Sequence, residues 1–406
     1  MNLDLLKGVR VVESSAFIAA PLAGMTMAQF GADVIRIDLI GGGIDHARMP
    51  VIPGGPSLYW TGLNKGKRSL AVDFRKPEGR ELVRALVAAP GPSGGVLLTN
   101  LGTPWLSHAS LVEQRPDLVS CTIEGNADGS TAVDYTVNCA VGFPAITGGG
   151  SPERPVNHVL PAWDLACAYQ TAFAIAAALL RRAVTGQGAE LRLALSDVAF
   201  STLSHLGMLA EAELLDRERP SLGNDLYGAF GRDFGTADGR RVYVAAISLG
   251  QWKSLVRACA LQAPVERLQQ ERGIDLSHEA QRFEARDAIA SFVEPWCRAR
   301  TLEQIRAVFA EHGVCWGPYQ SVREALARDP RLSVANPIFS RVDTAGVGRH
   351  LAAGAAVREM RHERGPTQPA PVLGQHTDEV LMNVLGLDAA TVGALHDRGV
   401  VAGAAT

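Results

Sequence analysis

One stretch of the chain, residues 160–188, constrains the fold most strongly, and it reads LPAWDLACAYQTAFAIAAALLRRAVTGQG. Pro161 and Asp164 are typical of the first turn of a helix, where backbone N–H groups lack partners. Residues 181–182 are arginines that compensate the negative end, and Gly186 is typical of a stop. Almost every side chain between these signals is apolar. This pattern predicts a long helix buried in the core.

Asp164 lies at the start of that predicted helix, and the segment alone allows two interpretations. The simpler one is a capping carboxylate, because acidic residues are common where a helix begins. The other is a functional carboxylate at the floor of a cleft, since a carboxylate can act as a nucleophile toward an activated acyl group.

Composition restricts the classes of protein. The 406 residues predict two or three domains, and a net charge of -3 does not favour nucleic acid or an acidic membrane surface as a partner. The longest apolar run, 166–180, is shorter than the ~20 residues that a bilayer requires, so no membrane partner is expected. The six cysteines and ten histidines form no metal-binding motif. We expect a cytoplasmic enzyme with reduced cysteines and no metal.

The N-terminal part predicts a βαβ unit. Residues 8–14 alternate as a strand, residues 21–30 form a helix of small side chains, and residues 33–38 form a second strand. Asp38 occupies the place of the acidic residue in dinucleotide-binding folds, but the turn at 15–21 contains no glycine. We therefore predict a Rossmann-like layer without an NAD site.

The sequence pattern divides the chain into three predicted domain segments. Residues 1–222 are predicted to form the N-terminal part of a large domain, residues 223–330 a small α+β domain, and residues 331–406 a return to the large domain. A helical stretch is expected at 193–214 and a hairpin turn at 236–239. The last segment is predicted to be loop-rich up to a helix at 377–385, and the Ala/Gly tail after it to be frayed.

A basic loop at residues 64–69 reads NKGKRS. Three cations in four positions beside a glycine suit a phosphate group, although the spacing is not that of a Walker loop. A solvated run of charge is the alternative interpretation.

Six short stretches in order resemble the type III CoA-transferases. They are LKGVRVVES, GADVIRI, NKGKRS, KPEG, TADG and VLGQHT, and the resemblance runs from Leu6 to about Val400. It implies an α/β fold with a Rossmann-like large domain made from both chain ends and an inserted smaller α+β domain. It also implies an interlinked homodimer and an acyl-CoA substrate, with coenzyme A as part of that substrate and no permanently bound cofactor.

The resemblance assigns roles to particular residues. Asp164 matches the nucleophilic aspartate that forms a mixed anhydride and then an aspartyl-CoA thioester. Leu39 and His108 depart from the family, because some members carry CoA-binding arginines there. The positions that match the CoA site are Phe17, Ile18, Asn64, Lys67, Arg68, Asn100 and Leu101.

A racemase branch of the family uses two further acid/base groups beside the aspartate. The matching positions here are Val133 and Leu249, and neither can transfer a proton. Racemase activity is therefore the less favoured alternative.

Three stretches, residues 15–38, 57–69 and 132–148, resemble a subgroup that moves CoA between the two carboxyls of one branched, unsaturated C5 dicarboxylate. A trapped acceptor would have a high effective molarity. Tyr135 and Asn138 are candidates for orienting this dicarboxylate, or are merely structural. Residues 248–251 replace the glycine run that some intermolecular members use as a lid. Intermolecular transfer between an acyl-CoA and a different acid, and a non-catalytic CoA-binding scaffold, are the remaining alternatives.

Overall fold

The structure is a computed structural model that describes residues 3–92, 94–148, 151, 153–215, 218–361 and 363–404. The chain divides into two compact units, and each is described by itself. Unit 1 comprises Met1–Val141, Val159–Leu214 and Pro330–Thr406, and unit 2 comprises Gly142–His158 and Leu215–Asp329.

Residues 142–158 belong to unit 2, whereas the sequence placed them in the large domain. Hydrogen bonds explain the difference. The Leu222 N–H donates to the Ile146 carbonyl over 2.8 Å, and the Ser221 hydroxyl donates to the Gly148 carbonyl. This segment is thereby tied to the chain that enters unit 2.

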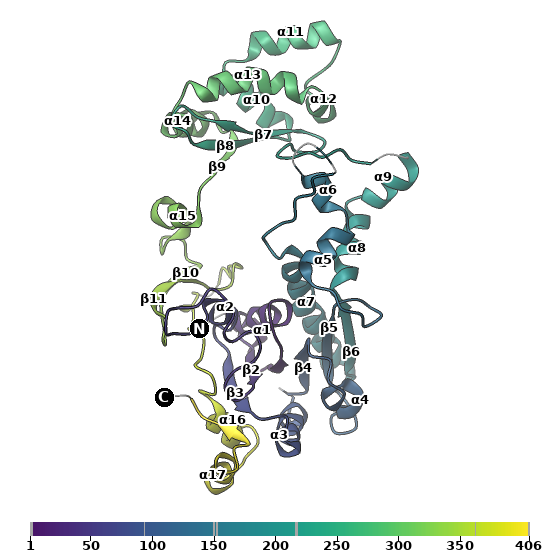
Figure 1. Cartoon of the computed structure of the whole chain (residues 1–406), viewed down its shortest axis with the longest axis vertical. Coiled ribbons are helices and arrows are strands. Elements are labelled where there is room, and N and C mark those ends of the chain that lie inside the picture. The colour runs from purple at the N-terminus through teal and green to yellow at the C-terminus, as the bar shows by residue number, and fades with distance from the viewer. Residues whose placement is uncertain are drawn as a thin grey trace. The chain divides into compact units, whose positions relative to one another are not determined.

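Unit 1 is built on a seven-stranded sheet in the order β12-β3-β2-β1-β4-β5-β6 (Figure 1). All neighbouring strands are parallel except β12, which pairs antiparallel with β3. The strands are β1 (Arg10–Ser14), β2 (Asp33–Asp38), β3 (Arg68–Val72), β4 (Val96–Thr99), β5 (Val119–Glu124), β6 (Ala189–Ala194) and β12 (Val401–Ala402).

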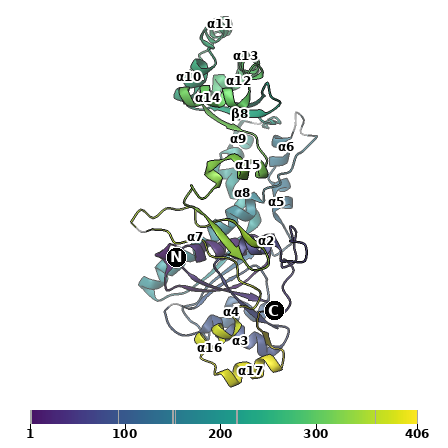
Figure 2. The same ribbon diagram turned by 90° about the vertical axis from the view of Figure 1, so that its left-hand side faces the viewer.

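Helices cover both faces of this sheet, as Figure 2 shows. Parallel strands need such cover, because the crossover connections place helices on the faces. On one face lie α1 (Ala19–Gln29) and α7 (Ala162–Thr185), which pack against each other. The other face carries α3 (Pro77–Ala88), α4 (His108–Leu111), α16 (Thr377–Asn383) and α17 (Ala389–Asp397). The coarse α/β prediction is therefore confirmed.

The N-terminal βαβ prediction is confirmed in its elements and its parallel pairing, with Arg10 opposite Asp33. The predicted helical stretch at 193–214 is wrong at its start. Strand β6 occupies residues up to Ala194, and α8 (Leu195–His205) and α9 (Met208–Leu215) follow. Residues 189–194 alternate between apolar and charged side chains, which suits the exposed edge of a sheet.

The C-terminal tail is more ordered than predicted. Strand β12 pairs with the open edge of β3, and the Asp73 N–H donates to the Val400 carbonyl over 2.8 Å. Val400 and Val401 are buried beneath α17. A hairpin of β10 (Phe339–Thr344) and β11 (Gly348–Ala353) was also not predicted. The tail is ordered because its apolar residues complete the core of unit 1.

Helix α7 is 24 residues long and ends at Gly186, whose φ of 72° is left-handed. The helix contacts α1, α5 (Asp134–Ala140), α8, β5 and β6. The prediction that it is buried on every side is wrong for this chain alone, because one face is exposed. By length and composition α7 could cross a bilayer, but the core helix of a soluble protein meets the same criterion. Its packing in unit 1 favours the core helix.

Unit 2 contains an antiparallel sheet of β7 (Phe230–Gly235), β8 (Arg241–Ala246) and β9 (Cys315–Pro318). The β7–β8 connection confirms the predicted turn at 236–239. Phe230, Trp252 and Phe309 lie in the core between this sheet and the helices. The helices that contribute to this core are α10 (Leu249–Ala258), α11 (Gln262–Arg272), α13 (Arg286–Arg298) and α14 (Leu302–His312). Unit 2 also contains α6 (Phe143–Thr147), α12 (Glu279–Glu284) and α15 (Val322–Arg328).

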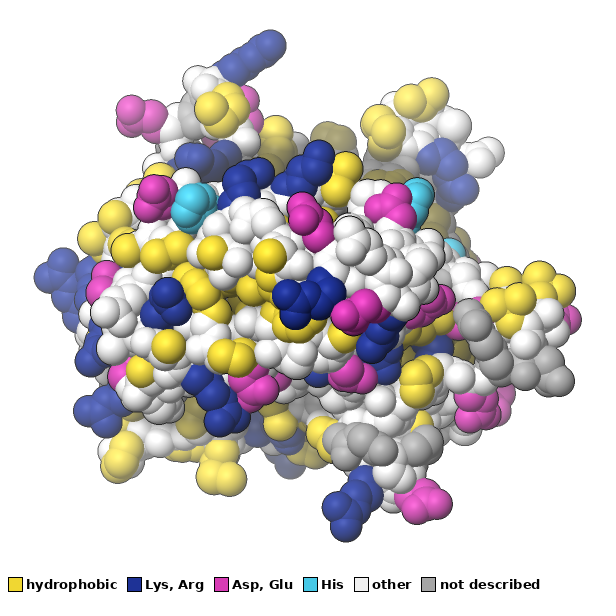
Figure 3. Space-filling model, turned by 90° about the horizontal axis from the view of Figure 1, so that it is seen from above, with side chains coloured by type: hydrophobic (Ala, Val, Ile, Leu, Met, Phe, Trp, Pro, Cys, Tyr) yellow, Lys and Arg dark blue, Asp and Glu magenta, His cyan; other side chains and the backbone are white. Residues whose placement is uncertain are grey.

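Figure 3 shows one face of the molecule in space-filling form. Lys and Arg side chains are interspersed there with Asp and Glu, and hydrophobic side chains lie between them. The face seen in that view therefore carries no surface of a single charge.

Candidate active site

The topological switch point of unit 1 lies at β1 and β4. The chain proceeds from β1 toward β3 in one direction and from β4 toward β6 in the other, and ligands of such sheets bind outside the carboxyl ends at the reversal. Asn100, which follows β4, holds the turn after β1 with two hydrogen bonds. Its Oδ1 accepts from the Ala16 N–H over 2.9 Å, and its Nδ2 donates to the Ala16 carbonyl over 2.8 Å. Two parts of the predicted CoA site are thereby brought together.

The turn after β1 is strained at Phe17. Its φ of 64° lies in the left-handed region, which residues other than glycine seldom adopt. The Phe17 N–H donates to Asp45 Oδ2 over 3.1 Å, and Ile18 follows directly as the N-cap of α1. Such strain costs on the order of 1–3 kcal/mol and is concentrated at functional sites. The geometry of this turn is thus typical of a ligand-binding position.

A buried ionic cluster lies below this turn, and sequence reasoning missed it. The Arg36 guanidinium on β2 donates to Asp38 Oδ1 over 2.8 Å, to Glu13 Oε1 over 3.4 Å and to Asp45 over 3.3 Å. Burial alone would lower the Arg36 pKa, but the three carboxylates outweigh it and raise the pKa. Glu13 and Arg36 are register partners on neighbouring strands, and this opposite-charge pair is the signal that could have revealed the cluster.

Lys67, predicted to bind CoA phosphate, belongs to the same cluster. Its side chain has no exposed surface, and its ammonium donates over 2.8 Å to Glu13 Oε1, to the Pro21 carbonyl and to Asn64 Oδ1. Burial lowers the Lys67 pKa to about 8, although Glu13 opposes the shift. All three donors are used, so a contact with phosphate would require Lys67 to leave these partners.

Asn64 and Arg68 also have protein partners. The Asn64 side chain is buried and donates to the Trp60 carbonyl over 2.8 Å. The Arg68 guanidinium pairs with Asp33 at 2.5 Å and with Glu379 at 3.1 Å. The basic loop is therefore an internal network in this structure, and its phosphate contacts stay a prediction.

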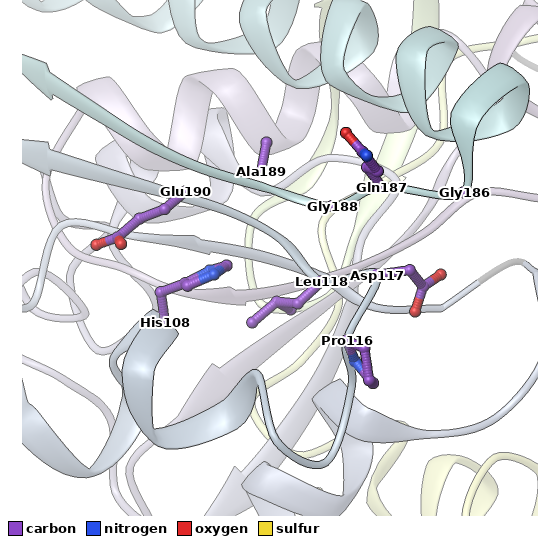
Figure 4. A pocket seen from close by; sticks show the side chains of 9 residues that line it. All are labelled: His108, Pro116, Asp117, Leu118, Gly186, Gln187, Gly188, Ala189 and Glu190. Carbon is purple, nitrogen blue, oxygen red and sulfur yellow. The ribbon is translucent and has the colours of Figure 1, made fainter.

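A pocket of about 480 Å³ lies at the amino ends of β5 and β6 (Figure 4). His108 lines it, with Nδ1 at 2.8 Å from the Ser120 hydroxyl, whereas Leu39 follows the carboxyl end of β2. His108 and Leu39, the two positions that depart from the family, therefore lie at opposite ends of the parallel strands. Gly186 also lines this pocket, and a helix rising 1.5 Å per residue separates it from Asp164 by roughly 33 Å. This pocket is not the site of Asp164.

Asp164 lies in the first turn of α7, but it does not cap that helix. The capping carboxylate is Asp134 at the start of α5, whose Oδ2 accepts from the Trp163 N–H over 2.7 Å and from the Asp164 N–H over 3.1 Å. The Asp164 side chain itself makes no hydrogen bond or ion pair to any residue that the structure describes. The simpler interpretation from the sequence, a capping role for Asp164, is therefore wrong.

Burial and charge give Asp164 a perturbed acidity. Its pKa is raised to about 7 in total: burial is the largest cause, the neighbouring Asp134 carboxylate adds to the rise, and the Arg48 guanidinium opposes it. A carboxylate that is desolvated and free of hydrogen bonds is more nucleophilic than one in water. Perturbed acidity of this kind is typical of functional groups.

The two candidates for orienting a dicarboxylate differ in exposure. Asn138 is buried, and its Oδ1 accepts from Trp163 Nε1 over 3.1 Å, so it supports the start of α7. Tyr135 is exposed, and its hydroxyl lies 3.5 Å from the Val159 carbonyl. Burial raises the pKa of the nearby Tyr59 to about 12, and the charge of Asp164 also acts on that phenol. Arg48 and Tyr59 are the residues near Asp164 that sequence reasoning missed.

An unpaired, partly buried carboxylate beside the crevice of a doubly wound sheet is typical of the active site of an α/β enzyme. Comparison with known families agrees with this class. The model of CoA-transferase family III matches residues 6–377, and the chain belongs to this family.

Individual relatives extend over nearly the whole chain. The 2-methylfumaryl-CoA isomerase of Chloroflexus aurantiacus is 49% identical over 401 residues, which cover 98% of each chain. The human succinyl-CoA:glutarate CoA-transferase is 25% identical over 98% of this chain and 90% of its own. The solved structure of a CAIB/BAIF family protein from Brucella suis covers 95% of this chain and 100% of its own with a TM-score of 0.76; at 24% identity it shows the fold.

Proposed function

We propose that this protein moves CoA between the C1 and C4 carboxyls of a single 2-methylfumaryl-CoA (mesaconyl-CoA) molecule. The observation that carries the proposal is the Asp164 carboxylate, which is partly buried and unpaired among the described residues at the start of α7. The substrate follows from the 49% identity to a 2-methylfumaryl-CoA isomerase over 98% of the chain.

The reaction consists of two matched halves. The Asp164 carboxylate attacks the C1 thioester carbonyl, the C–S bond breaks, and a mixed anhydride and CoA thiolate form. The thiolate then attacks the Asp164 carbonyl, which releases the free dicarboxylate and leaves an aspartyl-CoA thioester. In the second half, the C4 carboxylate attacks this thioester and expels thiolate. The thiolate attacks the C4 carbonyl of the new anhydride, which restores Asp164. No net proton or electron is transferred.

Asp134 has a positioning role in this scheme. It takes up the N–H groups of Trp163 and Asp164, so the donors at the start of α7 do not pair with the nucleophile. Its negative charge also keeps the Asp164 carboxylate reactive, because two close carboxylates raise each other's free energy when both are ionised.

The start of helix α10 in unit 2, at residues 248–251, favours the intramolecular reaction over transfer between different acids. Residues 248–251 form a capped helix start, where Ser248 Oγ accepts from the Gln251 N–H over 3.2 Å and Gln251 Oε1 accepts from the Ser248 N–H over 3.0 Å. A glycine run would be more mobile than this capping box. A fixed segment favours a substrate that stays bound between the first and second halves of the reaction.

The racemase alternative has little support. Val133 precedes α5 and Leu249 begins α10, and both side chains are apolar. Neither can donate or accept the second proton of a two-face transfer.

The CoA site is proposed at the switch point, with Phe17, Ile18, Asn100 and Leu101 forming its floor.

The basic loop at residues 64–69 is tested by titrating CoA against the Arg68→Ala variant, which shows whether Arg68 contacts a CoA phosphate. Arg10→Ala is the matched control, because Arg10 also pairs with Asp33, at 3.1 Å, but lies outside the loop. Weaker CoA binding in Arg68→Ala alone would support the contact, and equal affinities in both variants would exclude it.

We also propose the interlinked homodimer and a cytoplasmic location. The dimer is supported by an apolar stripe along α7, because soluble monomers rarely expose such contiguous surface. The exposed residues that form the stripe are Tyr169, Phe173, Leu180 and Val184.

The reaction is tested by a label-exclusion assay. The protein is incubated with 2-methylfumaryl-C1-CoA and excess isotopically labelled free 2-methylfumarate. The C1 and C4 esters are then separated, and their molecular masses are measured. We expect unlabelled C4 ester, because the acceptor never leaves the site. Labelled C4 ester would instead identify an intermolecular transferase. Asp164→Asn is the control, and turnover retained in that variant would contradict the anhydride mechanism.

A further inference from the structure

We propose that Arg48 binds the substrate carboxylate that is not joined to CoA and so selects dicarboxyl thioesters. The inference rests on the proposed function and deepens it, because it assigns a residue to the second carboxyl group. Neither sequence motifs nor the family resemblance pointed to this position.

The backbone of Arg48 is fixed by the same residue, Asp45, that fixes Phe17. The Arg48 N–H donates to the Asp45 carbonyl over 3.1 Å, and the Phe17 N–H donates to the Asp45 side chain over 3.1 Å. Asp45 is itself held by the buried Arg36. The Ser57 hydroxyl donates to the Arg48 carbonyl, and Ser57 caps α2 (Leu58–Leu63), which carries Tyr59. The three side chains Phe17, Arg48 and Tyr59 therefore share one rigid support.

Two aromatic rings hold the Arg48 guanidinium. Its central carbon lies 5.5 Å from the centroid of the Phe17 ring and 5.2 Å from that of the Tyr59 ring. Stacking on a ring uses the flat face of a guanidinium and leaves its N–H edge for a planar, bidentate partner such as a carboxylate. This arrangement also accounts for the left-handed Phe17, because the strained turn aims a ring at Arg48.

The Arg48 guanidinium has no carboxylate partner in the part of the chain that the structure describes, and its side chain is exposed. Arg36, Arg68 and Arg75 of the same unit, in contrast, each pair with an aspartate. A fixed, stacked and unpaired arginine is arranged for an anion that comes from outside the chain.

The Arg48 guanidinium lies over the Tyr59 ring, and its charge acts on both Tyr59 and Asp164, so it lies within electrostatic range of the reacting carboxylate. A trans dicarboxylate directs its two carboxyl groups in opposite directions. While the C1 carboxyl reacts with Asp164, the C4 carboxylate is the distal anion, and after the exchange the C1 carboxylate takes that place. One arginine therefore serves both halves of the reaction.

Binding titrations test the role of Arg48 without turnover. In an Asp164→Asn background, the affinity for 2-methylfumaryl-C1-CoA is compared with that for a thioester in which a methyl group replaces the free carboxylate. We expect Arg48→Gln to weaken binding of the dicarboxyl thioester by about 10- to 100-fold, as for loss of a charge-assisted pair. The methyl analogue should change by less than about threefold, because it has no carboxylate to lose.

The matched control is Arg181→Gln, which removes an exposed arginine at the far end of α7 and should change neither affinity. Arg48→Lys keeps the charge but lacks the planar fork, so an intermediate loss is expected. An equal loss for both thioesters would mean that Arg48 contacts CoA, and unchanged affinities would mean that it contacts neither; each result overturns the inference. The label-exclusion assay reports separately on the proposed reaction, since it uses the unmodified protein.

Discussion

The acidity of Asp164 makes the reaction dependent on pH in a defined direction. Its pKa is raised to about 7 by burial and by Asp134 and is lowered by Arg48, and only the ionised carboxylate is a nucleophile. We therefore expect kcat/KM to rise as the pH increases through about 7 and then to level off. Arg48→Gln should move this rise to higher pH, because a charge that lowers the pKa is removed. If kcat/KM of Arg48→Gln rises at the same pH as that of the wild type, this account is contradicted.

The same raised pKa predicts that the ionised nucleophile destabilises the fold at neutral and alkaline pH. The Asp164 pKa is about 7 in the folded chain against an ordinary value of 3.8, so the folded state binds the proton more tightly. Stability is therefore lost as the pH rises from about 4 to about 7, at roughly 1.4 kcal/mol per unit of pKa difference. Asp164→Asn should unfold at a higher temperature than the wild type at about pH 8, and thermal unfolding measures this. Equal unfolding temperatures for Asp164→Asn and the wild type at about pH 8 would contradict the predicted destabilisation.

At the scale of elements, the packing of α1 on β1 depends on Gly24. A Cβ atom at Gly24 would lie 1.7 Å from Glu13 Oε2, a distance that displaces the carboxylate shared by Lys67 and Arg36. We expect Gly24→Ala to destabilise unit 1 by about 3–5 kcal/mol, the range for disruption of a buried ion pair. Denaturant unfolding measures the loss.

The control for Gly24→Ala is Gly393→Ala in α17. A Cβ atom at Gly393 meets no other atom within 4 Å, so this helical alanine should stabilise the chain by about 0.5–1 kcal/mol. A neutral Gly24→Ala would show that Glu13 can move, and the ionic cluster would then not be rigid.

The sequence predicted the elements whose signals are local. The start of α7 at Pro161 and its end at Gly186, together with the βαβ unit of β1, α1 and β2, follow from helix signals and from periodicity. Strand β12 could not be predicted, because two residues carry no periodicity and their partner, β3, lies more than 300 residues earlier. Its order comes from tertiary contacts alone.

Prediction of the site was limited for the same reason. Asp164 was found through a helix signal and a family motif, whereas Arg48 lies in a loop and depends on Phe17, Asp45 and Tyr59 from separate segments. The roles expected for Lys67 and Asn64 came from the resemblance of the charged run at residues 64–69 to the family. That run could not show that the Lys67 ammonium would turn inward to Glu13.

For the whole molecule, the proposed dimer depends on the exposed stripe of α7. Phe173 is 74% exposed in the stripe, so a buried partner surface should not tolerate a charge there. We expect a dimeric wild type and a largely monomeric Phe173→Glu, as measured by light scattering. Val322→Glu, at a residue of unit 2 that is 83% exposed and outside the stripe, should remain dimeric. A monomeric wild type would exclude the dimer.

The pairing of β12 with β3 also sets the order of events during synthesis. The ribosome completes β3 about 330 residues before it reaches Val401, a delay of roughly 16 to 66 s at about 5–20 residues per second. Throughout that time the apolar surface later covered by Val380, Leu381, Val392 and Leu395 stays open. Nascent chains that already contain Asp164 thus lack part of their core, and they expose aggregation-prone apolar surface until the last helices emerge.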